Sequence, residues 1–483
     1  MTAAVLLLAL TLTDEQFTRG MALARAGRLD EARAALENGW RAAPSDKRFP
    51  IELAGLAYVA RDHSRAKRLL HRALEIDSAD LYANDFLGTL YFLEENYEAA
   101  LKYWNRAGKP ALSRVSIDGA RSETLVRRAI PAIECEPLSR DAWETARARL
   151  AALLDGAPHR LGLATENGRD YELHLVRLER PRWAEAAAMF SGVPYRTLYP
   201  QLHDAGSQSV HLDGLVRWDT FARRADLAVS GPVAANPKWL WQLRAGVRRE
   251  VWNLGGGGDR LLSRLEGGAS LRSIPSGRFQ WTTGVDLVRR ADASSIAGYW
   301  LQPVIGAQYA PLLLPERRLS LTLAGSAAVA RAFNPESARF ARFQAGADLR
   351  WRPRLTLDLR HRLRFGTVAG EAPFDELFQL GLDRDHDLRL RAQRNRRDGK
   401  KGVGPLGSSF ALSNFDLSQS LLRRPFLTIE AGPFLDAARA AGHWRTATGV
   451  QHRLRPLPGL TVGLSCGWDL RSAKPVLFPE TLR

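Results

Sequence analysis

The sequence predicts a multidomain chain: an all-α helical solenoid, then a small α/β module, then a transmembrane antiparallel β-barrel of about 12 to 16 strands. Three observations support this expectation. A 34-residue period of small and large apolar residues runs through roughly the first 110 positions. A strand–helix–helix–strand–strand pattern follows it. Past residue 208, apolar and polar residues alternate with a period of two, which is typical of strands with two different faces.

The helical region has small residues in one register, at Ala32, Ala66 and Ala100. A second register holds the larger residues Leu36, Leu70 and Trp104. Small residues let two helices of a hairpin approach closely, and the larger ones fill the gap to the next hairpin. The segments GRLDEARAAL, RDHSRAKRLL and ENYEAALKYW resemble the tetratricopeptide repeat over about residues 14–110. The resemblance implies a concave scaffold for a periplasmic protein partner; the alternative is a spacer that packs only on its own neighbours.

The first 13 residues contain an apolar run over residues 3–12. The run has the length of a secretory signal core and is too short to span a membrane. Residues 1–13 are therefore interpreted as a truncated signal segment, with the start of the first repeat helix as the alternative. The sequence contains no run of 18 apolar residues. An integral membrane protein with this sequence would have to be a barrel.

A different pattern covers residues 111–180. SRVSIDG predicts a strand, helices are expected after Ser122 and from Asp141, and two further strands flank an Asn-Gly turn. The order resembles the POTRA domain, including Ile-Asp-Gly after the first strand and Leu-Asp-Gly after the second helix. That resemblance implies a sheet edge that accepts a strand from a client chain. An unrelated α/β spacer is the alternative. Residues 181–208 are expected to be a linker.

The barrel is predicted for residues 209–483. In one run, leucines at 357, 359 and 363 alternate with Asp358, Arg360 and Arg362. Strands of about 10 to 14 residues exceed the usual length in soluble proteins and match a tilted bilayer crossing. The pattern favours apolar side chains toward lipid and polar ones toward a lumen, over a soluble β-sandwich. Trp239 and Trp252, at strand ends, are expected in the interface girdles.

One segment, residues 384–407, breaks the alternation with a basic, glycine-containing loop. It is followed by SSFALSNFDLSQSLL, PFLTIEAGPFLDAARA and TATGVQHRLRPLPGL. This order resembles the outer-membrane protein assembly superfamily of BamA/TamA-type barrels. In that family a long loop with a Val-Arg-Gly-Tyr/Phe-type motif folds into the lumen, where its arginine meets a strand acid. The chain's last residues, VLFPETLR, depart from the family in lacking a terminal aromatic.

The resemblance implies a lumen lock at the loop. Leu390-Arg391-Ala392-Gln393 stands at the place of the motif, and GPFLDAA puts Asp436 at the place of the strand acid. The implied lumen-lock residues are Arg391, Gln393 and Asp436. Arg389 and Arg394 are alternatives to Arg391, and a solvated basic loop without lumen contacts is the alternative to the lock. Alanine and glutamine replace the family's glycine and aromatic residue.

Composition and motifs argue against catalysis and nucleic-acid binding. The formal net charge is +17, but the basic residues are scattered and sit in no familiar nucleic-acid motif. The two cysteines, Cys135 and Cys466, fit no metal-ligand spacing. No GxSxG, HExxH or P-loop occurs, and residues 255–258 are interpreted as a glycine turn. We expect no enzyme activity, no cofactor, no metal and no nucleic-acid partner.

The expected function is assembly or translocation of other proteins at the bacterial outer membrane, with the N-terminal half in the periplasm. The expected partners are membrane lipid, unfolded outer-membrane or secreted client proteins, and a periplasmic protein bound through the repeats. The alternative is an exopolysaccharide export porin with a tetratricopeptide-repeat scaffold, which the arginine-rich inner face keeps open. Residues 111–180 discriminate the two, because an exporter needs no POTRA-like module.

Overall fold

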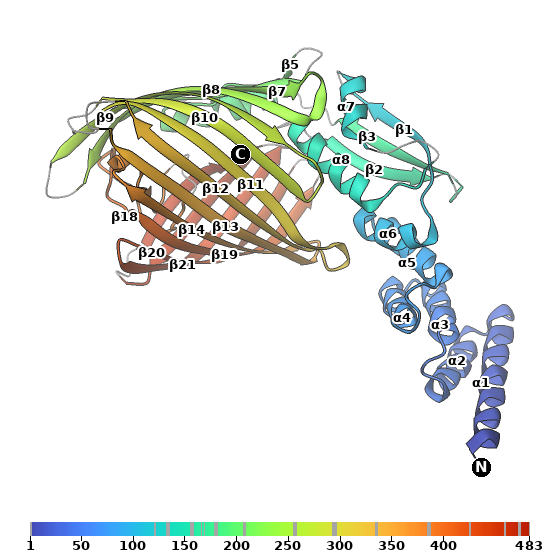
Figure 1. Ribbon diagram of the computed structural model, residues 1–483. Helices are drawn as coiled ribbons and strands as arrows, with labels where there is room; N and C mark the ends of the chain where they lie inside the picture. Colours follow the sequence, from blue (N-terminus) through green and yellow to red (C-terminus); the bar gives the residue numbers. More distant parts are fainter. Residues whose placement is uncertain are drawn as a thin grey trace. The chain divides into compact units, whose positions relative to one another are not determined.

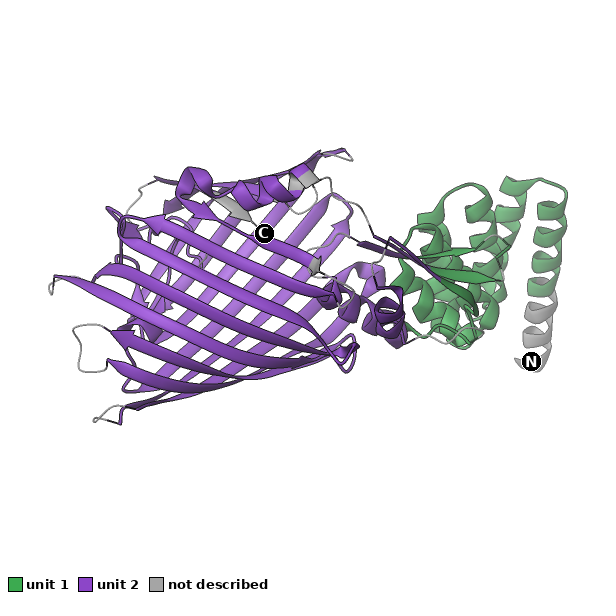
Figure 2. Cartoon of the chain, turned by 90° about the horizontal axis from the view of Figure 1, so that it is seen from above, with its two compact units in different colours: residues 1–115, 132–140, 162–173 green, residues 116–131, 141–161, 174–483 purple. Residues whose placement is uncertain are grey.

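A computed structural model of the chain describes residues 2–119, 122–131, 136–154, 159–165, 167–168, 170–177, 182–205, 209–254, 258–291, 297–333, 337–383, 388–424, 427–457, 460–471 and 475–482. The chain divides into two compact units (Figure 2). The first comprises residues 1–115, 132–140 and 162–173. The second comprises residues 116–131, 141–161 and 174–483.

Three helical hairpins form most of the first unit (Figure 1). They are α1 (Thr2–Arg25) with α2 (Leu29–Ala42), α3 (Arg48–Val59) with α4 (His63–Ile76), and α5 (Leu81–Leu93) with α6 (Tyr97–Trp104), followed by the turn η1 (Asn105–Ala107). Residues 2–13, interpreted above as a signal segment or a helix start, form the first half of α1. In the part of the chain that the structure describes, no helix is both long and apolar enough to cross a membrane.

The small residues of the 34-residue register lie where helices meet. Ala32, Ala66 and Ala100 are all fully buried. At Gly88 on α5, an added Cβ would lie 2.3 Å from Cδ1 of Trp104, so only glycine lets α6 pack this closely. Asp80 begins α5 by accepting a hydrogen bond from the backbone N–H of Ala83. The sequence period therefore reflects helix–helix contacts inside and between hairpins.

The module after the hairpins has the predicted order of elements. It contains β1 (Leu112–Asp118), α7 (Glu123–Ala129), α8 (Arg140–Leu153), β2 (His159–Thr165) and β3 (Tyr171–Arg177), and the sheet order is β1-β3-β2. Ser122 occupies the N-cap position of α7, although its side chain makes no capping hydrogen bond. Cys135 and the Asp-Gly of the second motif, residues 155–156, lie outside the described residues.

Residues 181–208 are not a linker, contrary to the sequence-based expectation. They contain α9 (Arg182–Phe190), the turn η2 (Val193–Tyr195), β4 (Thr197–Leu198) and β5 (Gln201–Ala205). Both short strands pair with β6, so the barrel wall begins near residue 197 instead of 209. Pro200 separates the two strand pieces, and neither is long enough to show an alternating pattern.

A closed barrel forms the rest of the second unit (Figure 1). Its long strands are β6 (Val210–Asp219), β7 (Ala222–Val233), β8 (Asn236–Asn253), β9 (Asp259–Ser273), β10 (Phe279–Ala291), β11 (Gly298–Leu314), β12 (Leu319–Ala332), β13 (Arg339–Arg354), β14 (Leu357–Gly370), β19 (Ser409–Arg424), β20 (Leu427–Ala440), β21 (His443–Leu457), β22 (Leu460–Asp469) and β23 (Pro475–Leu482). A turn, η4 (Pro315–Arg317), joins β11 to β12. Successive strands pair antiparallel, and β23 lies beside β4, so the sheet closes on itself.

The outer face of the barrel is apolar and uncovered. Leu243, Ile305 and Val329 are 55%, 62% and 61% exposed, although each lies within a long strand that is paired on both sides. Their strand neighbours, such as Arg244, point the other way because successive side chains of a strand alternate between its faces. An apolar surface that surrounds a closed barrel would drive association in water, so this face belongs against lipid.

The two girdle tryptophans have different positions. Trp239 lies on the outer face, edge-on to Trp281 with ring centroids 5.5 Å apart. The expectation for Trp252 is wrong, because it is buried on the inner face, where it contacts Phe374 and carries Lys401 4.6 Å above its ring. The two residues are an odd number of positions apart on β8, so one strand cannot turn both of them outward.

The two ends of the barrel differ in their connections. At one end the chain turns at residues 234–235, 274–278 and 355–356. At the other end, 38 residues connect β14 to β19. Helix α8, in the same compact unit, contacts the end with the short turns. Glu144 of α8 forms an ion pair with Arg278 at 2.8 Å, and the hydroxyl of Thr145 accepts a hydrogen bond from the backbone N–H of Gly277 at 3.0 Å. We call this the short-turn end.

Candidate functional site

The connection between β14 and β19, residues 371–408, folds into the barrel, and we call it the lumen loop. It contains η5 (Phe374–Glu376), β15 (Phe378–Gln379), β16 (Arg396–Arg397), β17 (Lys400–Lys401) and β18 (Leu406–Gly407). Leu380, Leu388 and Leu390 are buried in one apolar cluster with the inward-facing Trp300 and Phe410. The described part of the loop is therefore packed against the wall rather than solvated. Residues 384–387 of the predicted basic loop lie outside the described residues.

Arg391 and Asp436 are brought together, as the resemblance implies. Asp436 lies on β20 and is fully buried, and Arg391 is 5% exposed. The guanidinium donates to both carboxylate oxygens, with Nε 2.9 Å from Oδ2 and Nη2 2.5 Å from Oδ1. The backbone N–H of Arg391 donates to the same Oδ2 at 2.8 Å. A bidentate pair with a third donor fixes both the charge and the direction of the loop backbone.

Further wall residues complete the Arg391 site. The guanidinium Nη1 also donates to Asp416 on β19 and, at 3.1 Å, to Oε1 of Gln451 on β21. Asn414 donates to Asp436 at 2.8 Å and to the carbonyl of Arg389 at 2.9 Å. The guanidinium carbon lies 3.9 Å from the ring centroid of Phe434, where a cation–π contact adds to the ion pairs.

The charge of Arg391 is held by its partners. Burial acts to lower the pKa of Arg391, but hydrogen bonds and charges from Asp436 and Asp416 outweigh burial, so the net pKa is raised above its ordinary value. The site therefore keeps a permanent cation between two buried carboxylates. Removing the cation would leave both carboxylates without their main counter-charge.

The remaining sequence-predicted residues have other positions. Gln393 does not join the Arg391–Asp436 pair; its side-chain amide donates to Asp469 on β22. Arg394 is exposed, so it is not the arginine that reaches the wall acids. The backbone carbonyl of Arg389 accepts a hydrogen bond from Asn414. Arg391 is thus the candidate arginine whose side chain is seen to pair with Asp436 in the described residues.

Ala392 has a backbone conformation that favours glycine. Its φ is +85°, a conformation in which a Cβ is strained. The methyl group is accommodated because β22 carries Gly467, whose own Cβ would lie 3.2 Å from that of Ala392. The left-handed backbone at Ala392 is thus held at the cost of local strain.

Replacing Ala392 with glycine is expected to stabilise the folded protein by about 1 kcal/mol, because it removes the left-handed strain without removing a contact of Arg391. The midpoint of heat-induced unfolding, read from the shift in gel migration, should rise. Ala411→Gly on the extended strand β19 is the matched control and should lower it. A lower midpoint for Ala392→Gly would contradict the assigned strain.

A second set of contacts, the acidic clasp, lies at the start of the lumen loop. Asp375 and Glu376 are buried among Arg264, Arg290 and Arg342, which come from β9, β10 and β13. Asp375 accepts from Arg264 at 2.7 Å and from Arg290 at 3.0 Å. Glu376 accepts from Arg264 at 2.9 Å, from Arg342 at 3.0 Å, and also from Arg290. Two carboxylates on the loop thus hold three strands of the wall.

The clasp makes a specific pH prediction. Burial raises the pKa of Glu376, but the charges of Arg264, Arg290 and Arg342 outweigh it and lower the pKa from 4.5 to about 2. A lowered pKa stabilises the folded state fully above about 4.5, and this stabilisation is lost as the pH falls toward about 2. The unfolding midpoint should therefore fall more steeply in wild type than in Glu376→Gln between these pH values. Parallel curves for the two proteins would contradict this.

A third set of contacts fastens the end of the loop to β6 and β8. Arg396 pairs with Asp383 at 3.0 Å and with Glu250 on β8 at 3.1 Å. Lys401 adds an ion pair to Glu250 at 3.5 Å, and Arg217 on β6 reaches Asp383 at 3.6 Å. The three sets of contacts together attach the loop to strands all round the barrel.

Sequence reasoning missed the acidic clasp and the Arg396 contacts. Asp375 and Glu376 form a short acidic pair after Pro373, and nothing in the sequence links this pair to arginines 34 to 112 residues away. The one available signal was the inward position of Arg264, Arg290 and Arg342 in their alternating strands. Alternation along a strand predicts which side of the sheet a residue faces. It does not predict which residue it contacts, because the register between strands cannot be read from one strand alone.

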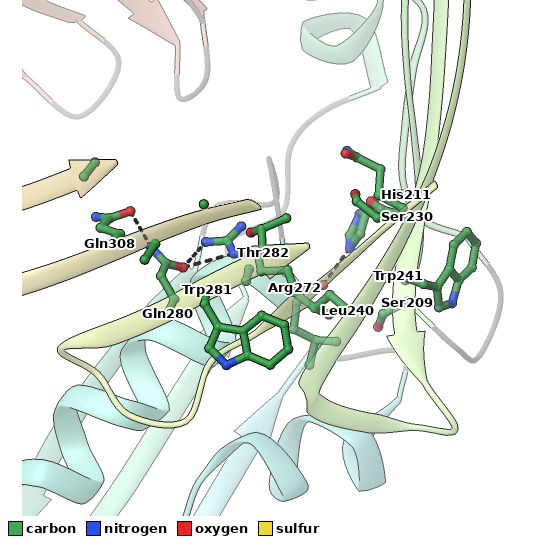
Figure 3. A pocket seen from close by; sticks show the side chains of 18 of the residues that line it. Ser209, His211, Ser230, Leu240, Trp241, Arg272, Gln280, Trp281, Thr282 and Gln308 are labelled. Atoms are coloured by element: carbon green, nitrogen blue, oxygen red, sulfur yellow. Dashed lines mark hydrogen bonds between the residues drawn. The ribbon is translucent and has the colours of Figure 1, made fainter. Parts of the chain in front are cut away.

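A separate cavity of about 470 Å³ lies on the inner wall at the short-turn end (Figure 3). Gln280 on β10 links Gln308 on β11 with Arg272 on β9, through hydrogen bonds drawn in the figure. His211 contacts the carbonyl of Leu153, the last residue of α8, at 2.7 Å. The lining is mainly uncharged and hydrogen-bonding, so it suits a polar chain rather than an apolar ligand.

Comparisons with known proteins bear on this fold. No protein-family model and no curated protein matches the sequence. Among solved structures, CdiB from Escherichia coli is similar with a TM-score of 0.53 and 14% identity, over 77% of this chain and 75% of that one. The chain has the barrel fold of CdiB. At this identity the likeness concerns fold alone.

Two weaker likenesses were also found. BamA from Haemophilus ducreyi, lacking POTRA domains 1–3, has a TM-score of 0.42 and 11% identity over 78% of this chain and 85% of that one. The first TPR of Spaghetti (RPAP3), bound to the HSP90 peptide SRMEEVD, has a TM-score of 0.20 and 20% identity over 20% of this chain and 77% of that one. Neither score is high enough to support an argument, so the repeat and POTRA resemblances rest on the sequence.

The contacts of the lumen loop described above hold it against the barrel wall. Within the described ranges, no three His, Cys, Asp or Glu side chains gather closely enough to hold a metal ion. Arg391, Asp436 and Asp416 are engaged with one another at hydrogen-bonding distance. These contacts give the loop a fixed position inside the barrel.

Proposed function

We propose that the chain assembles or secretes other proteins at the bacterial outer membrane, in the manner of BamA/TamA-type barrels. The observation that carries the proposal is the lumen loop fastened by Arg391 to Asp436 inside a closed, lipid-facing barrel. The CdiB-like fold and the strand–helix–helix–strand–strand module before the barrel support it.

In this proposal the N-terminal half lies in the periplasm as a recruiting arm. The helical hairpins bind a periplasmic protein, and the sheet of the module offers an edge strand, β1 or β2, to an unfolded client. The barrel binds membrane lipid and admits the client, and the lumen loop regulates this admission. The chain uses no catalytic residue and no cofactor, and client folding supplies the free energy.

The test compares cells with and without the gene, and cells carrying Arg391→Gln. We expect a defined set of proteins to disappear from the outer membrane or the culture medium in the deletion strain, and to be reduced by Arg391→Gln. Arg397→Gln, an exposed arginine on the same loop, should restore wild-type levels. Unchanged protein profiles in the deletion strain would contradict the proposal.

A polysaccharide export porin is the second candidate, because arginines line the inner wall. Its support is charge alone: Arg350, Arg352 and Arg360 face the lumen. The same deletion strain separates the two functions. Loss of a surface polysaccharide, with outer-membrane and secreted proteins unchanged, would favour export of a glycan.

A further inference from the structure

Four arginines line the lumen near the short-turn end, and we call them the arginine strip. Arg350 and Arg352 lie on β13, Arg360 on β14 and Arg455 on β21. The turns that follow β13 and β21 are at the same end as the turn contacted by α8, because antiparallel strands reverse direction at each connection. The strip is therefore on the wall between the lumen loop and the short-turn end.

The arrangement of arginines in the strip does not favour the stability of the barrel wall. Arg350 and Arg360 are direct cross-strand partners, and like charges placed opposite each other destabilise a sheet. Each is balanced diagonally: Arg350 bonds Asp358 at 3.1 Å, and Arg360 bonds Asp348 at 3.0 Å. A wall that needed only stability would do better with opposite charges facing directly.

The arginines protrude beyond the carboxylates that balance them. In the pairs Arg350–Asp358 and Arg360–Asp348, the arginine side chains are 40% and 43% exposed against 30% and 33% for the acids. Arg455 is 46% exposed and its partner Glu430 only 19%. The carboxylates are thus recessed, and a chain in the lumen meets guanidinium groups first.

The spacing of the strip matches an extended polypeptide. Arg350 and Arg352 are two residues apart on one face of β13, so their Cα atoms are about 7 Å apart along the strand. Alternate side chains of an extended client segment have the same repeat. Guanidinium groups bind carboxylates with two parallel hydrogen bonds, so acidic residues at alternate positions of such a segment fit the strip.

We propose that the arginine strip binds the carboxylates of an acidic, extended polypeptide segment that enters the lumen from the short-turn end. This inference rests on the proposed function, since it names the chemistry of the client segment. In this complex the carboxylates of the client pair with the arginines. The aspartates that pair with these arginines in the structure, Asp348 and Asp358, then accept hydrogen bonds from backbone N–H groups of the client.

The experiment measures binding of a labelled 12-residue peptide with glutamate at alternate positions. The detergent-solubilised full chain is titrated against it, and fluorescence anisotropy reports binding. Arg350→Gln with Arg360→Gln is expected to weaken binding about tenfold, since each exposed ion pair contributes a few-fold. A second peptide has glutamine in place of glutamate. Its affinity for the wild-type protein should be as low as, or lower than, the affinity of the glutamate peptide for the double variant.

The matched control removes the same charge from the outer face. Arg223 and Arg249 are exposed cross-strand partners on β7 and β8, so Arg223→Gln with Arg249→Gln should leave peptide affinity unchanged. If the first variant fails to fold, the charge-neutral quadruple variant, which adds Asp348→Asn and Asp358→Asn, replaces it and should show the same loss.

Equal affinity losses for the inner and outer variants, or no loss for the inner one, would overturn the proposal. Tighter binding of an oligouronate of equal charge would also overturn it and transfer the strip to a glycan. The client assay in cells is independent of this measurement. Loss of strip binding with a normal client profile contradicts only the strip, whereas an unchanged profile in the deletion strain contradicts the proposed function.

Discussion

Replacing Arg391 with alanine is expected to lower the stability of the folded barrel by about 3–5 kcal/mol, because it leaves Asp436 and Asp416 buried without their main counter-charge. The large effect follows from geometry: one guanidinium satisfies two acids and the backbone of Arg391 adds a third bond to Asp436. The measurement is the temperature at which the purified protein loses its compact gel migration, which should fall markedly.

Two variants give the Arg391 result its meaning. Arg391→Lys keeps the charge but cannot donate two parallel hydrogen bonds to Asp436, so it should recover only part of the loss. Arg397→Ala removes an exposed arginine from the same loop and should behave as wild type. If Arg391→Ala and Arg397→Ala unfold at the same temperature, Arg391 does not hold the loop.

The second large effect is expected from Glu376→Gln. The substitution leaves Asp375 to balance Arg264 and Arg290, with Glu266 as a second partner of Arg264, and it removes the carboxylate that pairs with Arg342. We expect a loss of about 3 kcal/mol, since an uncompensated buried charge costs more than a missing hydrogen bond. The loss should appear in the same unfolding midpoint at neutral pH.

The compensation test for the clasp uses Arg342, the most exposed of its three arginines. Adding Arg342→Gln to Glu376→Gln restores the charge balance and should recover part of the lost stability. Asp398→Asn, at an exposed acid of the same loop, serves as the control and should have no effect. A double variant less stable than Glu376→Gln alone would show that charge balance is not what the clasp provides.

The fold could be predicted from the sequence in those regions where a residue pattern repeats many times. The 34-residue register placed Ala32, Ala66 and Ala100, and alternation placed the strands with their outward leucines, because both periods arise from geometry that repeats many times. Short or interrupted elements carry no such signal. For this reason residues 181–208 were assigned to a linker although they hold the first wall strands, β4 and β5.

The candidate site was readable only in part. The motif resemblance led to Arg391 and Asp436, which the structure brings together, and to Gln393, whose amide donates to Asp469 on β22. The acidic clasp was not found, since its ion pairs join distant strands through a loop whose path is set by packing. Trp252 was misassigned because a tryptophan at the end of a strand is compatible both with an outer girdle and with the buried position inside the barrel that it occupies.

Everything proposed for the loop depends on a lipid-facing outer wall and an aqueous or loop-filled interior. The most direct test places single nitroxide labels along residues 343–350 of β13 in lipid vesicles, with Cys135 and Cys466 replaced by serine. Oxygen dissolved in the lipid should enhance the relaxation of labels at the outward positions, Phe343, Ala345, Ala347 and Leu349. Labels at the inward positions, Gln344, Gly346, Asp348 and Arg350, should instead be relaxed by a water-soluble nickel chelate, or by neither reagent where the loop covers them. Oxygen accessibility without this period of two, or with the opposite phase, would contradict the barrel and the lumen loop together.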